Sequence, residues 1–115
     1  MTEYIGARNS KGTVVWIVES GIRRKLPRRF AGSKVYMHSC EFEWGYAGSG
    51  PSQLAFSLCF NALDGDLERA ARIYMDFKFR HVAGFDHAGW KMTKDEVVAA
   101  IKDLEAERER KIATA

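Results

Sequence analysis

The sequence has few of the features that mark specialised protein classes. It holds two cysteines and two prolines in 115 residues. Cys40 and Cys59 form no CxxC pair, and a chain of 115 residues is long enough to bury a core without a disulfide or a metal ion to stabilise it. No apolar run approaches the roughly 20 residues of a membrane-spanning helix. The opening MTEYIGARN shows no secretory leader, which predicts a cytoplasmic protein with no membrane partner.

The remaining composition is that of a globular domain, with 46% hydrophobic and 29% charged residues. One domain over residues 1–115 is expected from this length. Residues 1–40 hold eight basic and two acidic side chains, for a net charge of +6, while the other residues carry −3. This asymmetry favours an acidic partner such as a nucleotide, a nucleic acid or an acidic protein surface. A solvated basic edge strand that discourages aggregation explains it equally well.

Residues 1–40 predict a basic antiparallel β-meander. Short β-type runs at 4–8 and 13–19 flank a turn at 9–12, and Ser20-Gly21 leads into a third run at 22–26. The second run is apolar on both faces, which predicts a central strand. A further short strand is suggested at 35–37. The outer strand and its continuation supply the candidate surface for a protein or nucleic-acid partner: Arg23, Arg24, Lys25, Arg28 and Arg29.

Residues 51–111 predict three helices. The first, at 51–63, is apolar nearly all round and should lie in the interior. The second runs from 67 to just before Gly84, with Lys78 on its outer side. The third begins at the capping box Thr93-Lys-Asp-Glu96 and leaves the domain beyond Leu104. The expected fold class is α+β, a small antiparallel N-terminal β-meander packed on a three-helix C-terminal part with a central buried helix.

A glycine-rich loop at 41–50 joins the two parts. It resembles the phosphate loop GxxxxGK[ST], but Pro51 stands where that motif has its lysine, which argues against nucleotide hydrolysis. The local pattern predicts a helix start with Gly50 as the cap, Pro51 at the first helical position and Gln53 reaching back to the N–H of the cap. A turn that only starts a helix is the simpler reading.

The functional reading of the same loop is an anion site at the positive end of a helix. The backbone N–H groups around Gly48, Ser49 and Ser52 would face outward to bind phosphate or carboxylate, and Trp44 and Tyr46 could stack a nucleobase. Glu41 and Glu43 would repel such a ligand unless they are otherwise engaged. The candidate ligand-binding residues are Trp44, Tyr46, Gly48, Ser49, Gly50, Ser52 and Gln53.

The loop also carries a family resemblance. The run F-E-W-G-Y-x-G-S-G-P-x-Q-L-A over residues 42–55 resembles the signature of a small family of bacterial and phage proteins that is classed as a domain of unknown function. Tyr4-x-Gly6-x-Arg8, Leu26-x-Arg28, His38-Ser39 and Tyr74-x-x-Phe77-Lys78 extend the resemblance over most of the chain. The resemblance implies a shared fold and a phage or mobile-element setting, and it implies no reaction.

Catalysis has weak support in the sequence. His38 with Glu41 or Glu43 could act as an acid and base pair, but no activated nucleophile accompanies them. The metal-ligand candidates, His38, Cys40, His81 and His87 together with Asp86, fit no zinc spacing, so neither a metal nor a cofactor is expected. Trp16, Trp44 and Trp90 are typical of core or interface anchors.

The sequence therefore predicts a non-catalytic accessory protein of phage or mobile-element type that acts by stoichiometric binding of a phosphate-bearing ligand, either a nucleotide or a nucleic acid. An inhibitor of a bacterial defence system that binds a host protein is the alternative. A small hydrolase that uses His38 is third, and a homo-oligomer fits any of these.

Overall fold

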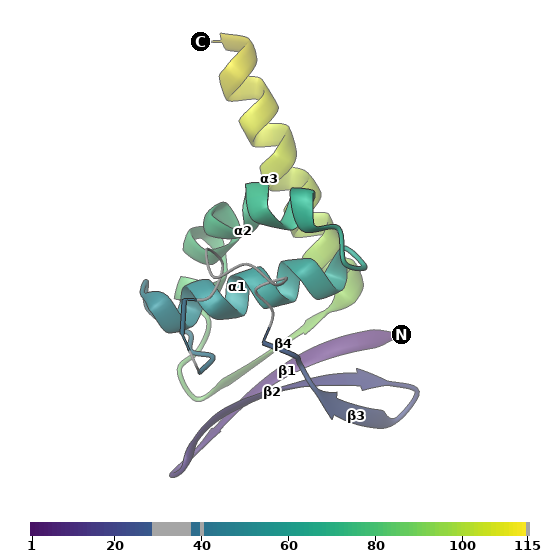
Figure 1. Cartoon of the computed structure of the whole chain (residues 1–115), viewed down its shortest axis with the longest axis vertical. Helices are drawn as coiled ribbons and strands as arrows, with labels where there is room; N and C mark the ends of the chain where they lie inside the picture. Colours follow the sequence, from purple (N-terminus) through teal and green to yellow (C-terminus); the bar gives the residue numbers. More distant parts are fainter. Residues whose placement is uncertain (29–37, 40, 115) are drawn as a thin grey trace.

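The computed structural model of the chain describes residues 1–28, 38–39 and 41–114. A four-stranded antiparallel sheet of order β3-β2-β1-β4 lies beneath a group of helices (Figure 1). The elements in chain order are β1 (Thr2–Asn9), β2 (Gly12–Glu19), β3 (Ile22–Lys25), α1 (Ser49–Ala62), α2 (Leu67–Arg80), the short 3-10 helix η2 (Val82–Gly84), β4 (Gly89–Thr93) and α3 (Lys94–Thr114). This arrangement confirms the α+β class.

The three-stranded meander agrees with the prediction, but the sheet has a fourth strand, β4, that the sequence pattern does not indicate. β4 pairs with β1 on the side opposite β2, in a register that places Gly6 across from Trp90. Its five residues have too short an alternation to mark a strand, and their partner lies more than 80 residues away in the chain. The strand suggested at 35–37 and the basic residue Arg29 lie outside the described residues.

The two faces of the sheet differ because only one is covered by helices (Figure 1). Alternate residues of the central strands, Tyr4, Gly6, Val15 and Ile17, are buried on the helix side. The residues between them, including Ile5, Val14, Trp16 and Val18, are partly exposed on the other side. β2 is a central strand with apolar side chains on both faces, as predicted.

The core is built around α1, which is buried along most of its length. Leu54, Phe56 and Leu58 are fully buried in a single cluster with sheet residues and with α2. The helix ends at Ala62, and Asp64 and Gly65 then adopt positive φ values of 54° and 84°. Glycine favours such a left-handed backbone after a helix. The Asp64-Gly65 pair therefore marks the end of α1, as predicted.

The outer helices begin at the caps that the sequence predicts. Asp66 accepts a hydrogen bond from the Arg69 N–H at the start of α2. At the start of α3, Thr93 Oγ1 accepts from the Glu96 N–H and Glu96 Oε1 accepts from the Thr93 N–H. The expected departure of α3 beyond Leu104 comes too early, because Glu105, Glu107 and Arg108 still form ion pairs with α2. The last turns of α3 then extend away from the rest of the molecule (Figure 1). No helix in the described part of the chain is long and apolar enough to cross a membrane.

Candidate functional site: the N-terminal end of helix α1

Helix α1 begins two residues earlier than the sequence predicts. Gly48 is the N-cap with an extended backbone, Ser49 is the first helical residue, and the Ser52 N–H donates to the Gly48 carbonyl at 3.0 Å. The predicted cap, Gly50, is therefore inside the helix, and Pro51 occupies its third position. Proline is tolerated there because N–H groups of the first turn have no acceptor within the helix.

Two backbone donors are left open at this end. Gly48 provides no side-chain cap, and among the described residues no acceptor receives the N–H of Ser49 or Gly50. Ser49 is exposed, whereas Gly50 and Ser52 are buried. The prediction of a free Ser52 N–H is wrong, because the helix uses it. The open donors at the positive end of α1 form the geometry that binds an anion.

A lysine ammonium lies directly under this first turn. Lys78 on α2 is 6% exposed, and its Nζ donates to Ser52 Oγ at 3.0 Å, while Ser52 Oγ donates to the Gly48 carbonyl at 3.0 Å. Within the described part of the chain, no carboxylate oxygen lies within 4.0 Å of this ammonium. A buried cation without a counter-ion is costly, and here it adds to the positive end of the helix dipole.

The predicted outer position of Lys78 is thus wrong. Lys78 follows the buried Tyr74 by four residues, so the two side chains lie next to each other on one face of α2. This spacing indicates that Lys78 is buried. The prediction placed it in solvent because charged residues are seldom buried.

Gln53 does not cap the helix. Its side-chain Oε1 accepts hydrogen bonds from the N–H groups of His38 at 2.8 Å and Ser39 at 3.3 Å, and it is fully buried. His38 Nε2 lies 2.8 Å from the hydroxyl of Tyr74. Burial and, secondarily, the charge of Lys78 lower the pKa of His38. Gln53 therefore fixes the chain that precedes the loop, and the proposed acid-base residue contacts a phenol.

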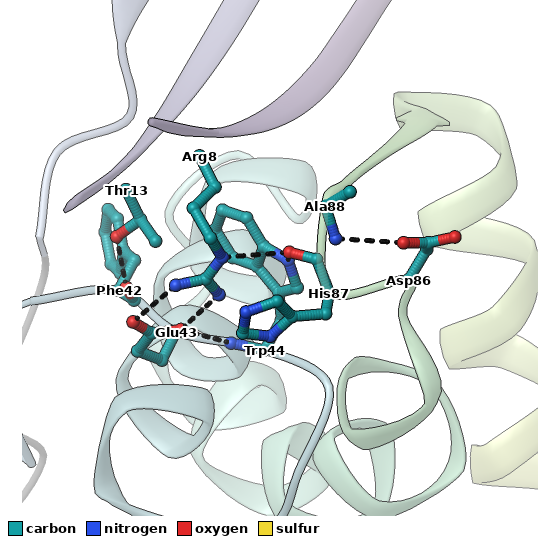
Figure 2. Close-up of polar contacts among 8 residues, drawn as sticks. All are labelled: Arg8, Thr13, Phe42, Glu43, Trp44, Asp86, His87 and Ala88. Atoms are coloured by element: carbon teal, nitrogen blue, oxygen red, sulfur yellow. Dashed lines mark hydrogen bonds and ion pairs between the residues drawn. The ribbon is translucent and has the colours of Figure 1, made fainter. Parts of the chain in front are cut away.

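Glu43 is held by an arginine from the sheet (Figure 2). Arg8 at the end of β1 forms two hydrogen bonds with its carboxylate, of 2.6 and 3.1 Å, and Arg8 Nε donates to the His87 carbonyl at 2.9 Å. Thr13 Oγ1 donates to the Phe42 carbonyl at 2.6 Å on the same side of the loop. Because Arg8 neutralises Glu43, the expected repulsion of an anion by this carboxylate is removed.

The two aromatic residues of the loop have different environments. Trp44 is fully buried, its Nε1–H donates to the His87 carbonyl at 3.0 Å, and its ring meets Trp90 edge to face. It cannot stack a ligand, so that prediction is wrong, and its alternative role as a core anchor is confirmed. Tyr46 is 51% exposed and covers Gly48, where an added Cβ would lie 2.7 Å from its ring. Only Tyr46 is placed to contact a ligand.

The residues of the basic strand β3 face two different parts of the molecule. Arg23, Arg24, Lys25 and Arg28 are all exposed. Arg24 lines a hollow of about 420 Å³ with Asn61 and Asp64, at the C-terminal end of α1. The open N-terminal end of α1 lies at the opposite end of the same helix from Arg24. Lys25, by contrast, lines a second hollow of about 220 Å³ with Glu41 and Phe42 of the loop, so the predicted joint surface holds in part at Lys25 and not at Arg24.

The Arg8–Glu43 pair makes stability dependent on pH. Hydrogen bonds from Arg8 lower the pKa of Glu43 below its ordinary value, so the folded state binds this proton less readily than the unfolded chain does. The stabilisation is therefore present above the unfolded pKa and is lost as the pH falls through the folded value. We expect Glu43→Gln to lower the urea midpoint at about pH 7, and the difference from the unmodified protein to shrink at about pH 3.

Glu68→Gln is the matched control, because Glu68 pairs with Arg72 in the open, with side chains 84% and 52% exposed. That change should leave the midpoint nearly unaltered. A Glu43→Gln effect that persists unchanged at low pH would show that the ion pair is not its cause.

Comparison with known proteins identifies the family without a function. A family model described as a family of unknown function (DUF6166) matches residues 4–103, and the chain belongs to that family. No curated protein and no solved structure matches the chain. Within the described residues, no group of three or more histidine, cysteine, aspartate or glutamate side chains could hold a metal ion.

Proposed function

We propose that this member of the DUF6166 family is a non-catalytic binding protein that takes a phosphate-bearing small ligand at the N-terminal end of α1. The observation that carries the proposal is the ammonium of Lys78, buried on Ser52 beneath the first turn with no carboxylate neighbour in the described structure. A bound phosphate would supply the missing negative charge. Lys78 would thus supply the positive charge that the phosphate-loop motif takes from its own lysine, at whose position this chain has Pro51.

The donors and the charge act from two sides of the same turn. The Ser49 N–H, on an exposed residue, and the Gly50 N–H lack protein acceptors and would hold the phosphate oxygens. Lys78 would act from behind through Ser52, in a buried setting where charge interactions are stronger than in water. Exposed Tyr46 beside the turn offers a ring on which a nucleobase could stack.

The contact between Ser52 and Lys78 is also a pairing that hydrolases use, in which a neutral amine takes the hydroxyl proton. Here the hydroxyl donates to the Gly48 carbonyl and accepts from Nζ. Ser52 is also only 4% exposed. A hydroxyl that donates to a carbonyl and not to the lysine, on a side chain closed to a substrate, favours a binding site, and we propose no reaction.

The proposal predicts stabilisation by inorganic phosphate that depends on Lys78. A ligand at ten times its dissociation constant should stabilise the fold by about 1.4 kcal/mol and raise the melting temperature by a few degrees. Thermal unfolding is measured with phosphate, AMP and ADP against sodium chloride of equal ionic strength. We expect Lys78→Met to abolish the shift, while it leaves the ligand-free fold as stable or more stable, because a buried charge is removed.

Lys102→Met is the matched control, since Lys102 is an exposed lysine on α3. It should retain the full response to phosphate. The proposal fails if phosphate, AMP and ADP all leave the melting temperature unchanged, or if Lys78→Met and Lys102→Met respond to them equally. A larger shift with AMP than with phosphate that disappears in Tyr46→Ala would assign the base to Tyr46.

A further inference from the structure

The helix-free face of the sheet carries an aromatic residue among basic ones, and it lies away from the site at α1. Cross-strand neighbours share a face, so the register places Lys25, Trp16, Ile5 and Lys91 in one row across β3, β2, β1 and β4. Arg23, Val18, Glu3 and Thr93 form the next row. No described element covers these residues (Figure 1).

The apolar residues of this face do not belong to the core. Ile5, Trp16 and Val18 are partly exposed and are absent from the buried cluster and from the residues packed against it. Trp16 stands on a central strand, and the guanidinium of Arg23 lies over its ring at 4.2 Å from the centroid. A tryptophan with a guanidinium on its face presents a planar, positively charged platform.

The charges on the face select the kind of partner. Arg23, Lys25 and Lys91 are exposed cations, whereas Glu3 is the one acidic side chain in the two rows and is already paired with Lys91 at 3.5 Å. A polyanion with flat, unpaired rings matches both the charge and the platform. Single-stranded nucleic acid has these properties, because its phosphates meet the cations while its bases stack. A duplex keeps its bases paired and stacked and cannot use Trp16 in this way.

We propose that the open face of the sheet binds single-stranded nucleic acid, with Trp16 and Arg23 as the stacking platform and Lys25 and Lys91 as phosphate contacts. An antiparallel four-stranded sheet that stacks bases on its exposed face is a recurrent solution to this task. With one tryptophan, the affinity should be modest and should depend mainly on charge.

The experiment is a fluorescence-anisotropy titration of a short labelled oligothymidylate at several sodium chloride concentrations. The charges of Arg23, Lys25 and Lys91 together predict a slope of log K against log salt of about −2. Trp16→Leu should weaken binding about tenfold, and Arg23→Ala and Lys25→Ala should each reduce the slope by about 0.7. Lys102→Ala is the charge-matched control and should change neither quantity.

Several outcomes would overturn the proposal. The first two are no binding of the oligothymidylate at low salt, and an equal affinity for a duplex of the same length. The third is a Trp16→Leu variant that binds the oligonucleotide as well as Lys102→Ala does. The fourth is a dimer of the protein, detected by sedimentation, that Trp16→Leu dissociates. Circular dichroism of each variant checks the fold, and exposed Arg23 provides a second variant if Trp16→Leu unfolds. Lys78→Met should bind the oligonucleotide normally, so this proposal and the proposed phosphate site can fail independently.

Discussion

Replacement of Gly6 by alanine is expected to destabilise the protein by about 3 kcal/mol, because the new methyl group overpacks a filled position. A Cβ at Gly6 would lie 2.1 Å from Trp90 Nε1 and 2.4 Å from Trp90 Cε2. The indole cannot retreat easily, since it stacks on Phe85 with ring centroids 4.5 Å apart and meets Trp44 at 5.9 Å. Urea unfolding measures the change.

Gly84→Ala is the matched control for this prediction. A Cβ at Gly84 meets no atom within 4 Å. Its effect should stay within about 1 kcal/mol and could be stabilising, because alanine lowers the entropy of the unfolded chain. Equal effects of the two substitutions would mean that the contact of β1 with Trp90 is not as described.

Trp44→Ala is expected to cost about 4 kcal/mol, which is typical of a fully buried aromatic residue reduced to a methyl group. The substitution leaves a cavity beside Trp90 and removes the hydrogen bond to the His87 carbonyl. Since that carbonyl also accepts from Arg8 (Figure 2), the loop before α1 should loosen from the sheet. Denaturation and hydrogen exchange at residues 43–48 would show both effects.

Tyr46→Ala, two residues away, tests the same loop from its exposed side. It should change stability by less than about 1 kcal/mol, because Tyr46 is half exposed. A Trp44→Ala protein as stable as Tyr46→Ala would contradict the burial of the indole. The pair also separates the role of Trp44 in folding from any role of the loop in binding.

Elements with local chemical signals could be predicted from the sequence. Three such features depend only on residues close together in the sequence: the Thr93–Glu96 capping box, the Asp66 cap and the Ser20-Gly21 turn. The apolar pattern of residues 51–63 likewise identified the central helix, because a helix without a polar face can only be buried.

Features that depend on distant partners could not be predicted. Trp44 lies in a glycine-rich loop and has the local context of an exposed residue, yet its burial follows from Arg8 and His87, which are 79 residues apart. β4 forms only because β1 offers its free edge. The charge under α1 comes from Lys78, 26 residues after Ser52. The four-residue spacing from Tyr74 places Lys78 on the buried face of α2, but it does not tell which part of α1 that face meets.

The most direct test of the site at α1 is an amide NMR titration of the unmodified protein with inorganic phosphate at constant ionic strength. If the open end of α1 binds phosphate, the largest saturable shifts should belong to the Ser49 and Gly50 amides, and Lys78→Met should abolish them while Lys102→Met preserves them. Shifts confined to the basic strand β3, or the absence of any saturable shift at Ser49 and Gly50, would contradict the proposed site.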